Sequence, residues 1–188
     1  MSYKLQNTCI QRALDILKKV RVFLLLMAAV LLAGCYGKEL NLIDGDKQIS
    51  QQIDDAISQY IIQNYSTSYY PTEKQFEVHK VYGTSETDGI LSVYMWSYFG
   101  GFNKATGIET QSGHSLPAVI RLSKKEGTYS VIEYIEPKDG SMYQSSLEKM
   151  FPAKYVKSAQ RDSGNIGELQ KEMQKKANKW IEKQDKES

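Results

Sequence analysis

The feature that most constrains this chain is a short apolar run near its start, which ends at a cysteine. Val22–Ala33 contains no charge, no Pro and no Gly, and three basic residues lie just before it (Lys18, Lys19 and Arg21). A helix of this length spans about 18 Å, which is too short for the roughly 30 Å hydrocarbon core of a bilayer. A basic flank, a short apolar segment and then small residues are typical of a secretory signal peptide.

The residues that close this run, Leu32-Ala33-Gly34-Cys35, resemble the lipobox of bacterial lipoproteins. In that family the cysteine thiol receives a diacylglyceryl group, and a peptidase then cuts the chain just before the cysteine. The resemblance implies cleavage between Gly34 and Cys35, a signal peptide over residues 1–34, and a lipid-anchored protein on the extracytoplasmic face of the cell membrane. The alternative is a short buried helix, which fits poorly because the basic cluster Lys18–Arg21 is followed immediately by a run that is apolar on every face.

The composition after Cys35 bounds the size and the partners of the protein. This part holds 153 residues, which is enough for one domain with its own core. Five of the 24 Lys and Arg residues and one of the 22 acidic residues precede it, so its net charge is −2. No basic stripe remains to neutralise phosphates, and we therefore expect no nucleic acid partner. The two cysteines are Cys9 and Cys35, so no disulfide is expected within the domain.

The sequence after Cys35 predicts a polar tether over residues 35–47 and a single α+β domain over residues 48–188. Ile49, Ile53, Ile57 and Ile61 recur at helical spacing and predict an amphipathic helix over residues 48–64. Four strand-like stretches separated by turn signals follow, at Gln75–Thr84, Gly89–Phe99, Leu116–Lys124 and Thr128–Glu136. No intervening segment suits a parallel crossover, so the spacing favours an antiparallel meander.

Two further helices are predicted at the end of the chain. Tyr143–Met150 forms a short helix that stops at Phe151-Pro152, and Asn165–Lys183 forms the last helix. The last helix carries one apolar seam, made of Ile166, Leu169, Met173, Ala177 and Trp180. An N-terminal helix, a four-stranded antiparallel meander and C-terminal helices indicate the α+β class. A curved sheet wrapped around the first helix, as in cystatin-like or NTF2-like folds, is the first expectation. The alternative is an open sandwich with the last helix as a second layer on the sheet.

The strand Ile90–Phe99 alternates between two faces. One face is expected to pack on the first helix and carries Leu91, Val93, Met95 and Phe99. The other face carries Tyr94, Trp96 and Tyr98. Aromatic rings with polar tips are common in binding surfaces, so this second face is the candidate binding face. The alternative is that the apolar seam of the last helix covers it.

Signatures of catalysis or of metal binding are scarce. The chain has no Gly-rich phosphate loop and no G-x-S-x-G elbow. His79 and His114 are the only histidines, and two histidines without paired cysteines or clustered carboxylates are a weak metal signal. We therefore expect no catalytic residue, no metal and no cofactor. The alternative is a small hydrolase that uses His79 and His114 in a pocket of the curved sheet.

The stretch from Phe76 to Lys157 carries a second resemblance, in "FEVHKVYGT", "DGILSVYMWSYFGGF", "SGHSLPAVI" and "YSVIEYIEPKDGSMYQSSLEKMFP". Together they resemble the extracytoplasmic C-terminal domain of some Firmicute membrane proteins of the BlaR1 metallopeptidase type. The chain lacks the His-Glu-x-x-His motif of the peptidase and the Ser-x-x-Lys motif of penicillin sensing, so neither activity carries over. The resemblance implies a lipid-tethered relative of an accessory or sensory domain from a Gram-positive bacterium.

We therefore expect a non-enzymatic lipoprotein of the cell envelope with a binding, sensory or regulatory role. The diacylglyceryl group on Cys35 would hold it on the bilayer. Tyr94, Trp96 and Tyr98 would contact a protein or an envelope ligand.

Overall fold

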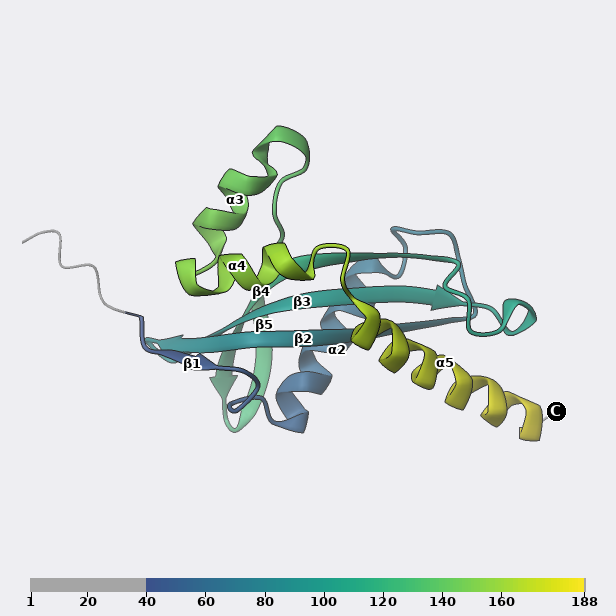
Figure 1. The fold of residues 1–188 in the computed structure, drawn as a ribbon. Helices are drawn as coiled ribbons and strands as arrows, with labels where there is room; N and C mark the ends of the chain where they lie inside the picture. The colour runs from purple at the N-terminus through teal and green to yellow at the C-terminus, as the bar shows by residue number, and fades with distance from the viewer. Residues whose placement is uncertain (1–39, 188) are drawn as a thin grey trace, which may run out of the picture. The chain divides into compact units, whose positions relative to one another are not determined.

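An antiparallel sheet of five strands forms the centre of the molecule, in a computed structural model that describes residues 40–187. The strands follow one another in the order β1-β2-β3-β4-β5, and each is paired antiparallel with the next (Figure 1). Their bounds, from β1 to β5, are Leu42–Asp44, Lys74–Thr87, Ile90–Phe102, Ser112–Lys125 and Thr128–Ile135. The antiparallel meander is therefore present, with β2, β3 and β4 longer than the sequence predicts, β5 one residue shorter, and one additional strand, β1.

Two tight turns set the register of the meander. Asp88-Gly89 joins β2 to β3, Glu126-Gly127 joins β4 to β5, and all four residues have positive φ. Two consecutive residues with positive φ make a type I′ turn, whose twist suits a two-residue hairpin. Both turns lie in stretches that the sequence marks as turns. They fix the pairing of the strands, and with it the side chains that face each side of the sheet.

Helix α2, Gln51–Tyr65, covers one face of the sheet and lies behind the strands in Figure 1. The Ser50 side chain caps its N-terminus by accepting a hydrogen bond from the backbone N–H of Ile53 at 3.4 Å. Buried residues of α2, β3 and β4 form one core cluster, made of Ile53, Ile57, Ile61, Leu91, Val93, Met95, Phe99, Ala118, Ile120 and Leu122. The predicted packing of this helix on the Leu91 face of the sheet is confirmed.

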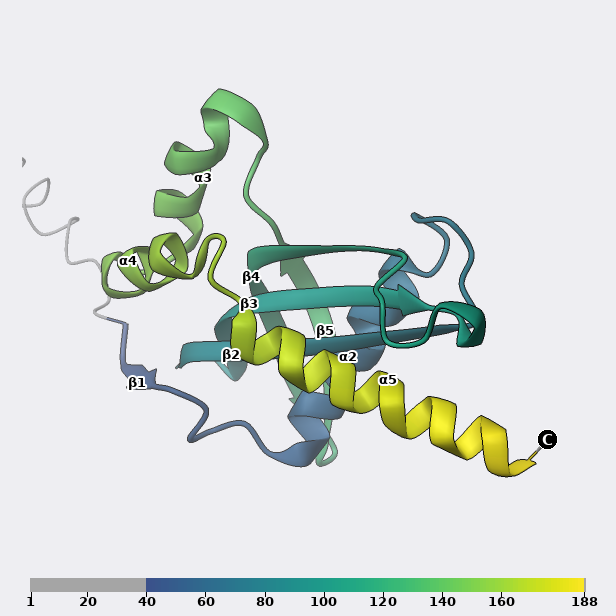
Figure 2. The same cartoon turned by 45° about the vertical axis from the view of Figure 1, so that its right-hand side comes forward.

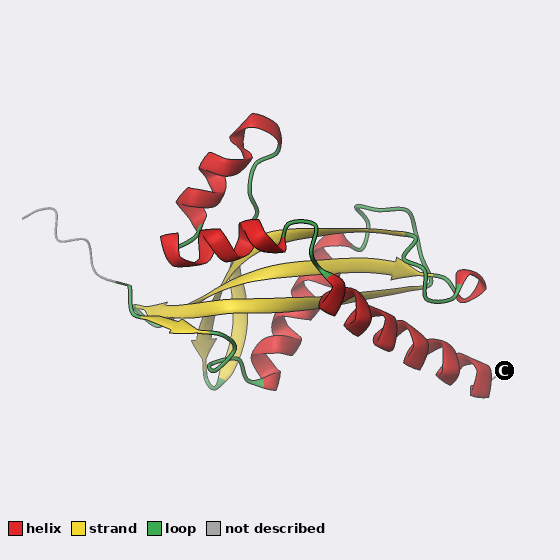
Figure 3. Ribbon diagram, viewed as in Figure 1, coloured by secondary structure: helices red, strands yellow, loops and turns green. Residues whose placement is uncertain are grey.

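Three helices follow β5 and cover the opposite face (Figures 2 and 3). They are α3 (Tyr143–Met150), α4 (Ala153–Asp162) and α5 (Gly167–Glu187). A second core cluster joins them to the sheet, and its buried members include Val78, Tyr94, Trp96, Leu147, Tyr155, Leu169, Met173 and Ala177. The last helix therefore forms a second layer on the sheet, and its predicted apolar seam is the part that packs.

Helix α4 is absent from the sequence prediction, because Phe151-Pro152 indicates the end of a helix. Pro152 does follow the end of α3, but it is also the N-cap of α4, where no helical N–H is required of it. The α+β class is confirmed in its broad form, with five strands in place of four and a strand, not a helix, as the first described element. Among residues 40–187, no helix is both long and apolar enough to cross a membrane.

Strand β1 lies inside the segment expected to be a tether, residues 35–47. Leu42–Asp44 pairs with Gly83–Ser85 at the end of β2. Asp44 also accepts hydrogen bonds from two side chains of α4, at 2.6 and 2.8 Å, which fixes this strand to the helices as well as to the sheet. A strand of this length has too little alternation to be recognised in a sequence.

Candidate functional site

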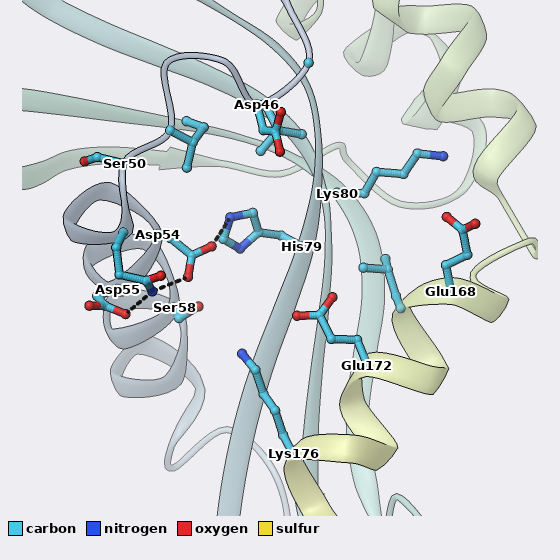
Figure 4. A pocket seen from close by; sticks show the side chains of 15 residues that line it. Asp46, Ser50, Asp54, Asp55, Ser58, His79, Lys80, Glu168, Glu172 and Lys176 are labelled. Carbon is cyan, nitrogen blue, oxygen red and sulfur yellow. Dashed lines mark hydrogen bonds and ion pairs between the residues drawn. The ribbon is translucent and has the colours of Figure 1, made fainter.

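A groove of about 940 Å³ runs across the outer edge of β2, with α2 on one side and α5 on the other (Figure 4). The loop between β1 and α2 closes one end. Five acidic side chains line the groove: Asp46, Asp54, Asp55, Glu168 and Glu172. They come from three separate segments, so only the tertiary structure brings them together.

A buried ion pair lies beneath this groove. The Glu77 carboxylate is fully buried, and its Oε2 lies 3.1 Å from Nδ1 of His79, the next residue but one on the same face of β2. Nε2 of His79 lies 3.3 Å from Oδ1 of Asp54, on the wall of the groove. Glu77 also accepts hydrogen bonds at 2.7 Å from the hydroxyl groups of Ser58 and Ser97. The carboxylate therefore has every partner that a buried charge requires.

This environment shifts the pKa values of both partners. Burial alone would lower the pKa of His79, but the charge and hydrogen bond of Glu77, with the charge of Asp54, outweigh burial and raise it. Burial alone would raise the pKa of Glu77, but the charge and hydrogen bond of His79, with those of the two serine hydroxyls, lower it. Both shifts favour the charged pair, imidazolium and carboxylate.

The carboxylates and the lysines of the groove differ in whether they have hydrogen-bond or ion-pair partners. Within residues 40–187, Asp46, Glu168 and Glu172 make no side-chain hydrogen bond or ion pair. Both lysines of the groove are already engaged. Lys80 pairs with Asp162 at 2.9 Å, and Nζ of Lys176 donates to the backbone oxygen of Glu77 at 2.9 Å. The groove therefore presents an excess of free negative charge to a ligand.

The structure corrects the expectation of an exposed aromatic face. Tyr94 is 6 % exposed and Trp96 is 3 % exposed, because α3, α4 and α5 pack over them. The polar tips also have internal partners: the Tyr94 hydroxyl bonds Ser85 at 3.1 Å, and Nε1 of Trp96 donates to Ser115 at 2.7 Å. The alternative, coverage by the last helix, holds for both residues. Their face of the sheet is core.

Tyr98, the third member of the predicted face, is partly buried. Its hydroxyl lies 2.9 Å from Oγ1 of Thr110. With Ile108 and Met173 it lines a separate groove of about 630 Å³ beside α5. Tyr98 is the only one of the three that is not buried, although Trp96, 3 % exposed, also borders a groove of about 490 Å³.

The two histidines lie in different clusters on the α2 side of the sheet. His114 stacks on Phe99 with ring centroids 5.5 Å apart, and its Nδ1 lies 2.9 Å from the hydroxyl of Tyr69. Burial lowers the pKa of His114, so its ring tends to be neutral where that of His79 is charged. His114 does not line the acidic groove, and the two rings share no hydrogen-bond or ion-pair partner, although the charge of Glu77 acts on both. The structure does not bring them into the single pocket that a hydrolase built on both would need.

Glu77 and Asp54 form no part of the site predicted from the sequence. A signal for the pair exists, since Glu77 and His79 are two residues apart in a predicted strand and therefore share a face. Across residues 40–187, no group of three or more His, Cys, Asp or Glu side chains is arranged to hold a metal ion. The predicted signal peptide and the predicted lipidation at Cys35 lie outside the described residues. Comparisons with protein-family models, with curated proteins and with solved structures find no match to this chain.

Proposed function

We propose that this chain is a lipid-anchored binding protein of the cell envelope, and that its acidic groove holds a cationic group of the ligand. The observation that carries the proposal is the groove beside β2, with three carboxylates that have no partner among residues 40–187. Fixed negative charge in a concave site attracts and retains a positive ligand. The groove replaces the buried face of Tyr94 and Trp96 as the binding surface.

The anchor is supported by the sequence around Cys35. A basic flank, a short apolar run and a small-residue pair precede the cysteine, as in lipoprotein signal peptides. Two acyl chains on this thiol give a stable attachment, whereas a single chain binds a bilayer only weakly. Cleavage before Cys35 leaves the rest of the chain on the extracytoplasmic face.

A binding role without catalysis is supported by the state of His79. Both ring nitrogens face carboxylates, which raise the pKa of His79 and so favour the protonated ring. A protonated imidazole has no lone pair with which to take a proton from a hydroxyl group. The nearby serines Ser58 and Ser97 donate to Glu77 and not to a histidine.

A sensory or regulatory role in the envelope follows from the same proposal. The resemblance to the extracytoplasmic domain of BlaR1-type proteins supports it, as does a fixed anchor next to a folded domain. A helix against an antiparallel sheet also supports a cystatin-like or NTF2-like arrangement, in which α2 is the wrapped helix. In such a role, ligand occupancy of the groove would be reported to a membrane partner.

The test is the affinity of the mature protein for the capped peptide acetyl-(Lys-Thr)₃-amide, with acetyl-(Glu-Thr)₃-amide as the control ligand. The lysine peptide is expected to bind, and added salt is expected to weaken it. Neutralising the free carboxylates (Asp46→Asn, Glu168→Gln and Glu172→Gln together) should weaken binding by about tenfold, since each charge pair at an exposed site contributes up to about 1 kcal/mol. A matched variant with Asp139→Asn, Glu109→Gln and Glu148→Gln should bind as the wild type does. Equal affinity for both peptides would contradict the proposal.

A further inference from the structure

The acidic groove also exposes one edge of the sheet. β1 pairs only with Gly83–Ser85, so the stretch of β2 from Lys74 to Val81 has no neighbouring strand on that side within the described residues. His79, Lys80 and Val81 of this stretch line the groove between α2 and α5. An edge strand presents N–H and C=O groups with which an extended chain can pair.

Two observations show which backbone groups face the groove. Lys176 Nζ donates to the backbone oxygen of Glu77, so this carbonyl points away from β3. Residues two apart on a strand direct their N–H and C=O groups to the same side, so those of His79 also face outward. The exposure of His79 agrees. Its side chain is only 3 % exposed although the residue as a whole is partly exposed, so the main chain is the part open to the groove.

We propose that the groove binds an extended peptide segment containing Lys or Arg, which adds to the free edge of β2 as a further strand. This inference rests on the proposed function, because it names the ligand class of the same groove. The ligand backbone pairs with the outward N–H and C=O groups of His79 and, once Lys176 is displaced, with those of Glu77, a residue that is 1 % exposed beneath the lysine. Alternate side chains of the added strand then point toward α2 and toward α5. The carboxylates on these two walls are those of Asp54, Asp55, Glu168 and Glu172.

The Lys176 side chain occupies the position from which a ligand would hydrogen-bond to the Glu77 carbonyl. Its ammonium sits on the Glu77 carbonyl, where a ligand N–H would donate, and its charge opposes a cationic ligand. Covering a sheet edge also protects it from pairing with unwanted chains, and Lys176 does this from helix α5. Binding displaces this side chain, so Lys176→Met is expected to tighten binding of acetyl-(Lys-Thr)₃-amide several-fold. Lys175→Met, at an exposed position of the same helix, is the control and should change the affinity much less. Weaker binding by the Lys176 variant than by the control would count against the pairing.

The direct test is residue-resolved amide hydrogen exchange of the mature protein in detergent micelles. Saturating acetyl-(Lys-Thr)₃-amide is expected to slow exchange of the Glu77 and His79 amides by about tenfold or more, because each N–H gains a hydrogen bond. Spermine, a cation without a peptide backbone, serves as the charge control. It should occupy the groove without slowing these two amides.

The outcomes separate this inference from the proposed function. If the lysine peptide binds and leaves the two amides unchanged, strand pairing is wrong and the cationic groove stands. The same conclusion follows if spermine slows them equally. If the lysine peptide binds no better than acetyl-(Glu-Thr)₃-amide, the cationic groove is wrong and the strand pairing falls with it.

Discussion

Glu77 and His79 form an ion pair, with Oε2 and Nδ1 3.1 Å apart, beneath the floor of the acidic groove. Both side chains are buried, and both belong to the edge strand whose main chain faces the groove. Two serine hydroxyls and Asp54 complete the network. The pair therefore ties the edge strand β2 to helix α2. The groove between α2 and α5 depends on this connection.

Glu77→Gln is expected to lower the free energy of unfolding by about 3–5 kcal/mol. Removing one partner of a buried ion pair is strongly destabilising, because the buried His79 imidazolium then keeps only Asp54, whose side chain is 42 % exposed. Urea denaturation followed by circular dichroism measures the change. Glu133→Gln is the matched control, because Glu133 pairs with Arg121 at the exposed surface and such pairs contribute about 0–1 kcal/mol. Equal effects of the two substitutions would contradict the role given to Glu77.

The same pair predicts how stability depends on pH. The pKa of His79 is raised above its ordinary value of 6.5, so its contribution is complete below about pH 6.5 and is lost as the pH rises through the raised value. The pKa of Glu77 is lowered from 4.5, so its contribution is present above about pH 4.5 and is lost as the pH falls through the lowered value.

The alkaline side of this profile can be assigned to one residue. The pKa of His114 is lowered by burial, so His114 changes the stability only at pH values below 6.5. Urea unfolding of the wild type from pH 6 to pH 9 should therefore show a loss of stability that His79→Gln does not show. Parallel profiles for the two proteins would remove His79 as the cause.

Gly83→Ala is expected to destabilise the protein by about 1–3 kcal/mol, as overpacking in a filled site does. Tyr155 crosses β2 at this glycine to reach Asp44, and a Cβ on Gly83 would clash with the Tyr155 hydroxyl and with the Ile43 carbonyl. Thermal unfolding gives the measurement. Gly167→Ala, at the start of α5 with no atom near its Cβ position, should be neutral or stabilising. Tolerance of alanine at position 83 would show that Tyr155 packs elsewhere.

Trp96→Ala is expected to lower the free energy of unfolding by about 3–5 kcal/mol, because Trp96 is part of the core under α5. Tyr70→Ala, at a ring that is 87 % exposed, should change it by less than about 0.5 kcal/mol. Chemical denaturation of both variants compares them directly. A small effect at Trp96 would contradict its burial and would make its face of the sheet a candidate binding surface again.

Much of the fold follows from local patterns in the sequence. The isoleucines of α2 recur at helical spacing, and the Asp88-Gly89 and Glu126-Gly127 pairs specify hairpin turns. Alternation along β3 separates the Leu91 face from the Trp96 face correctly. Alternation cannot decide whether helices also cover the Trp96 face. That depends on where α4 and α5 pack, and Pro152 conceals α4 by resembling a helix end.

The groove was not predictable in the same way. Its carboxylates come from the loop after β1, from α2 and from α5, segments that are distant in the chain and meet only through tertiary packing. In the sequence, Glu77 looks like any polar residue of a strand, and nothing local indicates that it is fully buried. Its partners Ser58 and Ser97 lie on different elements, so the buried network becomes visible only once α2 is placed on the sheet.

The proposed anchor at Cys35 would decide where the groove operates, and the intact mass of the expressed protein tests this anchor most directly. The account predicts a chain that begins at Cys35, carries a lipid-sized mass increment and partitions into the membrane fraction. Cys35→Ala should abolish both the cleavage and the increment. A wild-type chain in the soluble fraction without added mass would contradict the proposal of a lipid-anchored binding protein.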